Sequence, residues 1–322
     1  MSDIIKKKQH YLPKAYLRFF ATPKNKTAMI YAYFLATHEC KYVSIDDICF
    51  RNYLYEQKVN YPNSTTLEFI SPNELEDSFI ENEGNYASLV KRLVNEINCT
   101  DTYSIAENDL DILTLSLSLF QFRNPLFVNM TNYISEKVLI EQTDIAQSFK
   151  SEFPDIEESI IRAYISHEFL LRMIDPQNGI LVSSLRNVIQ KDQLCILRSN
   201  TTSYITSDSP IINIWGCRDN VDYDILGMPI TPNLFIAFID SEKELSPVID
   251  VDESDVKKLN EIQINRKAPR VFLSCDNNLS DEKSKQTIEN IEVAAGMELC
   301  EGVVLKEETL AFYNKMKESI RK

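Results

Sequence analysis

His10 and Pro13 are the first residues of the sequence whose types and spacing suggest chemistry. Pro13 suits the first position of a helix, because its ring fixes φ near the helical value and it lacks an N–H that the first turn would leave unpaired. His10 would then lie just outside the helix N-terminus, where the dipole favours an anion and disfavours imidazolium. A neutral imidazole beside a phosphate or carboxylate can transfer a proton, so His10 is a candidate general acid or base. Alternatively, the neighbouring aromatic residues anchor this segment in the core, and His10 is a hydrogen-bonded residue at its rim.

Glu83 and Arg123 are expected on two long helices. Apolar residues recur at helical spacing over Leu75–Ile97, which predicts one helix of about 25 residues with a single apolar face. Glu83 lies at the edge of that face, seven residues after Glu76, and a carboxylate there needs a partner or water. Arg123 ends a second predicted helix, Asp109–Arg123, and lies over its buried face. Because a buried guanidinium is rarely left unpaired, a carboxylate or a bound anion is expected beside Arg123.

Asp208 lies in the turn Thr206–Pro210 (TSDSP), just after a predicted strand. Its alternative role is that of an Asx-turn residue, whose side chain binds its own backbone. Strand ends and helix ends are, however, common positions for functional side chains. We therefore expect His10, Glu83, Arg123 and Asp208, each from a different element, to meet in one cavity.

The composition indicates a globular chain of ordinary type, with 322 residues of which 44% are hydrophobic. Six glycines and the lack of a GxGxxG or Walker-type motif argue against a glycine-rich nucleotide loop. The seven cysteines form no CxxC pair, which favours reduced core thiols over a disulfide framework or a zinc site. Thiol chemistry at Cys195 or Cys275 is a weaker alternative, because neither has a base next to it in sequence.

No apolar run approaches the roughly 20 residues of a membrane span, and no signal-type apolar segment follows the N-terminus, so a cytoplasmic protein without membrane contact is expected. The formal charge of −14 argues against broad, unspecific binding to nucleic acid. Residues 1–30 differ from the rest, with seven basic residues against Asp3 alone. This basic N-terminal end is expected to bind an anion such as a nucleic acid or a nucleotide, unless it is only a solvated lysine run.

The order of periodic segments predicts an α+β fold. We expect an antiparallel sheet built from N- and C-terminal strands, with a large helical block inserted at about residues 72–190 and a strand-rich part at about 193–275. One domain would cover residues 1–300, followed by a C-terminal helix within 301–322. Within this plan the predicted elements are a hairpin of Ala28–Leu35 and Lys41–Ile45 with His38 at its tip, a short helix at Asp46–Tyr55, helices at Asn132–Phe149, Ile156–Ile174 and Asp252–Arg266, a hairpin of Leu194–Leu197 and Ser203–Ile205, and strands at Ile225–Ile230, Leu234–Ile239 and Arg270–Ser274.

A series of short segments carries a family resemblance over nearly the whole chain. The segments are HYLPKAYLRFF, DICFRNYLY, LEDSFIENEGNYASLV, FQFRNP, YITSDSPI, GMPITP and LNEIQINRKAPRVF. Their order resembles the bacterial DUF4238 domain family, whose function is unknown, so the resemblance supplies no reaction. It implies that the polar landmarks of the family are His10, Glu83, Arg123, Asp208 and Asn260. Where the family commonly has a glutamine three residues before the arginine, this chain has Phe120, with Gln121 next to it.

Our first hypothesis is a hydrolase that acts on a phosphodiester or another anionic substrate, nuclease-like and suited to bacterial defence. His10 would act as general base or acid, and Arg123 with nearby lysines would hold the anion. Glu83 and Asp208 would bind a divalent metal such as Mg²⁺ or Mn²⁺, or would orient His10. Asn260 would complete the site. The alternative is a non-enzymatic binding module, in which the same polar set is a buried network and a surface recognises a partner protein or a signalling nucleotide.

Overall fold

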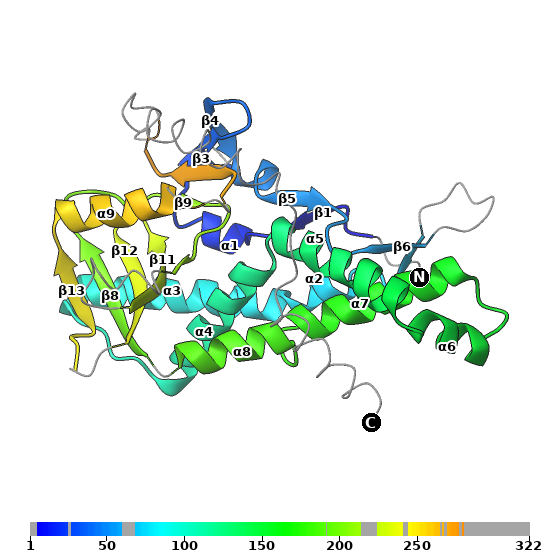
Figure 1. Cartoon of the computed structure of the whole chain (residues 1–322). Coiled ribbons are helices and arrows are strands. Elements are labelled where there is room, and N and C mark those ends of the chain that lie inside the picture. Colours follow the sequence, from blue (N-terminus) through cyan, green and yellow to red (C-terminus); the bar gives the residue numbers. More distant parts are fainter. Residues whose placement is uncertain are drawn as a thin grey trace.

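The computed structural model describes residues 5–24, 27–59, 68–190, 192–213, 224–240, 244–264, 266, 269–276 and 279. Within these ranges the chain has an α+β fold, in which a block of helices extends away from two larger sheets (Figure 1). The expected helix within 301–322 lies outside the described residues. None of the described helices combines the length and the apolarity that a bilayer crossing requires.

The first sheet joins strands from both ends of the described chain, as predicted. It runs in the order β2 (Thr22–Lys24), β3 (Thr27–Phe34), β14 (Val271–Ser274) and β9 (Thr206–Ser207), and β4 (Glu39–Ser44) also pairs with β3. The β3–β4 hairpin is confirmed, with exposed His38 at its tip in a left-handed conformation (φ 53°). Antiparallel pairing of β14 with both β3 and β9 brings the C-terminal part of the chain onto the N-terminal hairpin.

The second sheet is mixed and comes entirely from the strand-rich part. Its order is β10 (Ile212–Asn213), β11 (Asp224–Thr231), β12 (Leu234–Asp240), β8 (Gln193–Ser199) and β13 (Val248–Val251), with β13 parallel to β8. The predicted hairpin between Leu194–Leu197 and Ser203–Ile205 is wrong, because β8 pairs with β12 and the chain after Thr202 crosses to the first sheet. The remaining described strands form two-stranded pairs, β1 (Lys8–His10) with β5 (Phe50–Asn52) and β6 (Gln57–Val59) with β7 (Glu68–Ile70).

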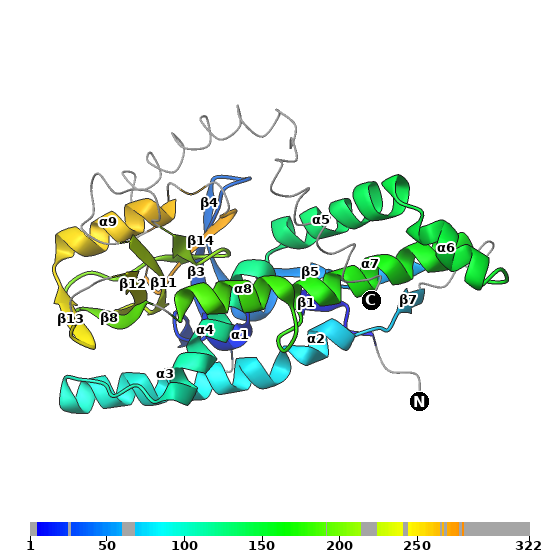
Figure 2. The same ribbon diagram turned by 60° about the horizontal axis from the view of Figure 1, so that its bottom comes forward.

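The helical block starts beside the second sheet and forms the opposite end of the molecule (Figures 1 and 2). Its helices are α2 (Glu74–Ser78), α3 (Ile80–Thr100), α4 (Glu107–Phe122), α5 (Pro125–Ile134), the π-helix η2 (Ser135–Ile140), α6 (Ile145–Glu152), α7 (Glu158–Ile174) and α8 (Ile180–Ile189). Outside the block lie α1 (Lys14–Leu17), the 3₁₀ helix η1 (Ile45–Asp47) and α9 (Glu253–Ile264).

Several predicted helices differ in detail from those observed. The helix expected at Asp46–Tyr55 is wrong: after η1 the chain forms β5, because Cys49 and Tyr53 have positive φ and the strand between them pairs with β1. The single helix expected over Leu75–Ile97 breaks at Phe79 into α2 and α3. The helix expected at Asn132–Phe149 is divided between α5, η2 and α6.

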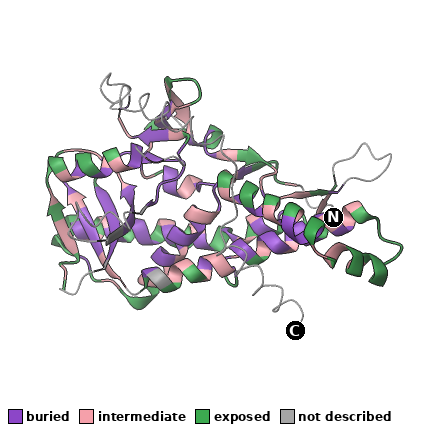
Figure 3. Ribbon diagram, viewed as in Figure 1, coloured by how far each residue is buried: buried purple, intermediate pink, exposed green. Residues whose placement is uncertain are grey.

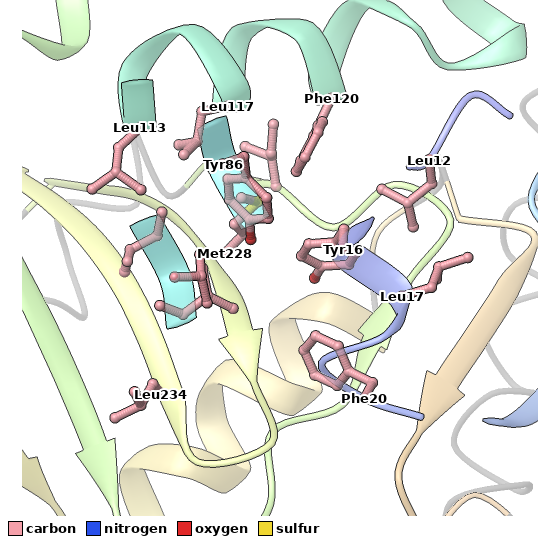
Figure 4. Close-up of a cluster of buried hydrophobic side chains, with 14 of the residues drawn as sticks. Leu12, Tyr16, Leu17, Phe20, Tyr86, Leu113, Leu117, Phe120, Met228 and Leu234 are labelled. Atoms are coloured by element: carbon pink, nitrogen blue, oxygen red, sulfur yellow. The ribbon is translucent and has the colours of Figure 1, made fainter. Parts of the chain in front are cut away.

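The main hydrophobic core lies where α1, α3, α4 and the second sheet meet, and its side chains are nearly all buried (Figures 3 and 4). Tyr16 is central to it, with its ring against Phe20, Tyr86 and Phe120. Its hydroxyl lies 2.6 Å from Thr206 Oγ1 and donates to the Pro229 carbonyl at 2.7 Å. One aromatic residue of a four-residue helix thus connects α3 and α4 to strands of both sheets.

Replacing Tyr16 by Phe should therefore lower the free energy of unfolding by about 1–3 kcal/mol, because it leaves buried polar partners of the hydroxyl unsatisfied. Urea denaturation followed by circular dichroism measures this change. Tyr42→Phe is the matched control, since its hydroxyl bonds Thr22 at the exposed edge of the sheet and its loss should change stability by less than about 0.5 kcal/mol. Equal losses in the two variants would contradict the central role of the Tyr16 hydroxyl.

Candidate functional site

Arg123 is the C-terminal cap residue of α4 and is almost completely buried, at 1% exposed. Its Nη1 donates to Glu83 Oε1 at 2.7 Å, its Nη2 donates to the backbone carbonyl of His10 at 2.6 Å, and its Nε donates to Tyr55 Oη at 3.3 Å. The guanidinium carbon lies 4.0 Å from the centre of the Phe79 ring. The carboxylate expected beside this arginine is therefore Glu83, and a chain segment distant in sequence supplies a second acceptor.

Asp208 forms a second buried centre just after β9, at 4% exposed. Its Oδ1 accepts hydrogen bonds from the backbone N–H groups of Arg270 at 2.8 Å and Val271 at 3.3 Å, and its Oδ2 accepts one from Tyr11 Oη at 3.2 Å. Burial raises the pKa of this carboxyl, and the two backbone N–H groups and the Tyr11 hydroxyl oppose that shift. Asp208 thus binds the strand that follows α9 rather than its own turn, where Ser207 Oγ accepts the N–H of Ser209 instead.

Residues adjacent in sequence link the two centres. Tyr11, which binds Asp208, follows His10, whose carbonyl binds Arg123. Asn124 follows Arg123 and donates through Nδ2 to the backbone carbonyl of Asp208 at 3.3 Å. The segments containing His10, Arg123 and Asp208 are therefore bound to one another through backbone groups and neighbouring side chains.

Asn260 lies apart from this network, on α9. Its Oδ1 accepts the N–H of Ile205 at 3.0 Å and its Nδ2 donates to the carbonyl of Ser203 at 3.0 Å. Both ends of the amide thus hold the segment before β9 against α9. The structure gives Asn260 this positioning role and does not place it with His10, Glu83 or Arg123.

The imidazole of His10 is partly buried against Phe50, with the ring centres 5.6 Å apart, and its Nε2 has no hydrogen-bond partner among the described residues. Burial, together with the positive charge of Lys14, lowers the pKa of His10 to about 4, while Asp46 opposes the shift. The ring is therefore neutral at physiological pH. Burial, rather than the dipole of a helix terminus, is the main cause of the lowered pKa, because His10 belongs to β1.

Glu76 has an environment that its position in the sequence does not reveal. It lies on α2, and its buried Oε2 has no hydrogen-bond partner within the described part of the chain. Burial raises the pKa of Glu76 to about 7; Arg123 opposes the shift and Glu83 adds to it. Its spacing of seven residues from Glu83 is visible in the sequence, but the burial of its Oε2 is not.

Further polar groups hold β1 in place through hydrogen bonds on the side of the helices. Gln9 is fully buried, donates through Nε2 to Glu56 Oε1 at 2.5 Å and accepts the N–H of Tyr55 at 2.9 Å. Glu56 also accepts the N–H of Asn73 at 3.1 Å, and burial raises the pKa of Glu56. The backbone that carries His10 is therefore held on both sides, by Arg123 and by Gln9.

Glu83 and Asp208 do not fit the divalent metal that the sequence suggests for them. Glu83 Oε1 is bound by Arg123, and both oxygens of Asp208 accept hydrogen bonds from protein donors. Across the residues that the structure describes, no group of three or more histidine, cysteine, aspartate or glutamate side chains is arranged to hold a metal ion. A Mg²⁺ or Mn²⁺ ion between these two carboxylates is therefore not supported by the residues present.

The basic N-terminal end is partly neutralised. Lys8 pairs with Asp47 at 2.8 Å, Lys14 pairs with Asp46 at 3.1 Å, and Lys6 pairs with Asp77. Cavities of about 400, 520 and 120 Å³ that described residues line include neither His10 nor Arg123 nor Asp208. Solvent reaches the Arg123 centre at Glu83, whose side chain is 28% exposed.

Taken together, the chain is an α+β protein whose N-terminal strand, helical block and C-terminal strand are joined by buried polar side chains. It belongs to the family described as protein of unknown function (DUF4238), whose model matches residues 8–278. No curated protein and no solved structure gives a significant match. The family match covers every residue of the expected site and leaves its chemistry open.

Asp208→Ala should lower the free energy of unfolding by about 2–4 kcal/mol, because the buried N–H groups of Arg270 and Val271 and the Tyr11 hydroxyl lose their acceptor. Asp208→Asn should lose clearly less stability, since its amide oxygen can still accept hydrogen bonds from the backbone N–H groups. Chemical denaturation of both variants tests this order. If Asp208→Asn lost as much stability as Asp208→Ala, the hydrogen bonds that the Asp208 side chain accepts would not explain the loss.

Glu76→Gln should stabilise the protein in alkaline solution. The folded-state pKa is raised to about 7 from 4.5, so the folded protein favours the protonated acid, and its stability is lost as the pH rises through about 7. Between about pH 5 and about pH 8 the wild type should lose about 2 kcal/mol relative to Glu76→Gln. Denaturation at the two pH values measures this difference. Glu152→Gln removes an exposed carboxylate and keeps Glu76, so it should lose stability over this pH range as the wild type does. A wild type that parallels Glu76→Gln would contradict the buried, protonated state.

Proposed function

We propose that the protein is a hydrolase that acts on a phosphodiester or another anionic substrate, with His10 and Glu76 as its acid–base pair. The observation that carries the proposal is that His10 Nε2 and Glu76 Oε2 are buried without a hydrogen-bond partner among the described residues, and that the charge of Arg123 acts on both residues. Two titratable groups whose environments move their pKa values in opposite directions are a common feature of acid–base sites.

The directions of the two pKa shifts support one proposed role for each residue. His10 is neutral above about pH 4, so its Nε2 can accept a proton from water. Glu76 retains its proton up to about pH 7 and can donate it. In the proposed step the water oxygen bonds to phosphorus as His10 takes the water proton, and the bond to the leaving oxygen breaks as Glu76 gives that oxygen a proton.

Arg123 positions these groups rather than contacting the substrate, since its side chain is buried and bonded to Glu83, Tyr55 and the His10 carbonyl. Its positive charge favours negative charge nearby, and Lys8 and Lys14 extend the positive potential around His10. This potential supports an anionic substrate. A nuclease-like activity on nucleic acid or nucleotides, in the bacterial cytoplasm and in defence, is the setting that we propose for it.

A non-enzymatic binding module is the second candidate. The observation in its favour is that Arg123, Asp208 and Asn260 are engaged with backbone groups from distant segments. Such bonds hold a fold together without taking part in a reaction. On this proposal the polar landmarks of the family preserve the architecture, and a surface recognises a partner protein or a signalling nucleotide.

Hydrolysis of bis(p-nitrophenyl) phosphate, single-stranded RNA and DNA, and cyclic dinucleotides tests the first candidate. The rate should be highest between about pH 4 and about pH 7, because His10 must be unprotonated and Glu76 protonated. His10→Ala and Glu76→Gln should each lower kcat/KM by about 100-fold or more. Glu76→Gln should also remove the fall in rate above about pH 7.

His38→Ala is the control, because it removes a histidine from the exposed tip of the β3–β4 hairpin. It should leave the rate unchanged. No hydrolysis by a folded wild type, or hydrolysis that His10→Ala and Glu76→Gln leave intact, would favour the binding module.

A further inference from the structure

An apolar cavity of about 120 Å³ lies between α6 and α7, at the end of the helical block that is farthest from the two larger sheets (Figures 1 and 2). Its apolar lining comes from η2, α6 and α7 and consists of Leu139, Ile145, Phe149, Tyr164, Ile165 and Phe169. An apolar cavity of about 150 Å³ holds a benzene molecule. The space is thus on the scale of an aromatic ring, and none of its lining residues belongs to the proposed hydrolase site.

The helix α6 is only half covered by the rest of the chain. It contains no buried residue, and Figure 3 shows intermediate and exposed residues along it. Its apolar side chains Ile145 and Phe149 pack, partly buried, against Ile161 and Ile165. A helix this short is stabilised by the packing of its apolar face more than by its intrinsic propensity. The uncovered part of that face therefore favours a further contact.

Exposed aromatic side chains extend the apolar lining to the surface. Phe153 is 43% exposed and Tyr164 is 41% exposed, and their ring centres lie 6.4 and 6.1 Å from that of Phe149. The turn after α6 is held in place, because Lys150 Nζ donates to the carbonyl of Ile156. Contiguous exposed apolar side chains mark interaction surfaces. We call the cavity and the residues around its opening the α6–α7 face.

Glu168 and Arg172 give the α6–α7 face a charged rim of both signs. They lie one turn apart on α7, and both line the cavity. Among the described residues neither has an ion-pair partner, although Glu168 accepts a hydrogen bond from the Tyr164 hydroxyl. A partner surface of a single sign would satisfy one of these charges and repel the other. A second copy satisfies both, because in a two-fold symmetric contact the same patch faces itself.

We propose that the α6–α7 face is the contact surface of a symmetric homodimer. The two-fold axis passes between Glu168 and Arg172, so each Glu168 pairs with Arg172 of the other copy, and the apolar linings of the two copies cover each other. The contact is independent of the proposed hydrolase activity, because it uses none of the residues assigned to that reaction.

Sedimentation velocity of the full chain over low to high micromolar concentrations tests this contact. The wild type should shift from monomer to dimer across the range. Glu168→Lys and Arg172→Glu should each weaken the dimer about tenfold or more, because each places two pairs of like charges across the axis. Phe153→Ser should also weaken it, because it removes an exposed apolar ring from the face.

An equimolar mixture of Glu168→Lys and Arg172→Glu is the most specific measurement. In the mixed dimer both charge pairs again have opposite signs. The mixture should therefore dimerise about as strongly as the wild type, although neither variant does so alone. Glu81→Lys and Ile80→Ser change exposed residues of α3, away from the face, and are the matched controls that should dimerise like the wild type. Circular dichroism melts show whether each variant is folded.

A chain that stays monomeric at high micromolar concentration overturns the proposal and would leave the α6–α7 face to a different protein. The proposal is also overturned if the mixture dimerises no better than its two components. A loss of dimer in Glu81→Lys or Ile80→Ser as large as that in Glu168→Lys would place the contact elsewhere and would overturn it as well.

Discussion

The burial of the Arg123 guanidinium is the interaction on which much of this structure depends. A charge removed from water must be met by acceptors with good geometry, or the folded state loses several kcal/mol. The acceptors here come from three separate places: Glu83 at the start of α3, Tyr55 between β5 and β6, and the backbone of His10 in β1. The N-terminal strand, the helical block and the loop between them are thereby held in one arrangement, and the same bonds hold the backbone that carries the His10 ring.

Asp208 is a buried carboxylate and likewise needs hydrogen-bond partners. Its oxygens accept two backbone N–H groups at the start of β14 and the hydroxyl of Tyr11, so one carboxylate connects the turn after β9 to both ends of the described chain. Asn124 and Tyr11, the direct sequence neighbours of Arg123 and His10, join this centre to the first one. Buried polar groups rarely remain without partners, and here their partners lie far away in sequence. The sheet of N- and C-terminal strands and the polar network thus hold the same segments of the chain together.

The sequence predicts those features that depend on local pattern or on a strong general requirement. The β3–β4 hairpin and α4 follow from alternation and helical periodicity, and a carboxylate beside Arg123 follows from the demand of a buried charge. Pairing between distant strands is less predictable: Phe50–Asn52 has a helix-like pattern but forms a strand because β1 lies beside it, and the chain after Thr202 leaves β8 for another sheet. The state of Glu76 is also hidden from the sequence, because its raised pKa results from burial by residues that the pattern does not bring together. Asn260 shows the opposite limit, since the family resemblance suggested it for the site, whereas its amide holds the segment before β9 against α9.

The break between α2 and α3 at Phe79 has a consequence for how the length of this chain can vary. Phe79 lies under the guanidinium, while Glu76 precedes it and Glu83 follows it, and both acids interact electrostatically with the same arginine. Each added or removed residue rotates the following part of a helix by about 100°. A single insertion between Glu76 and Glu83 would therefore turn one carboxylate away from Arg123, whereas insertions in the exposed β3–β4 tip would leave the network untouched. Homologous chains should consequently keep a constant count of residues across this junction even where their loops differ in size.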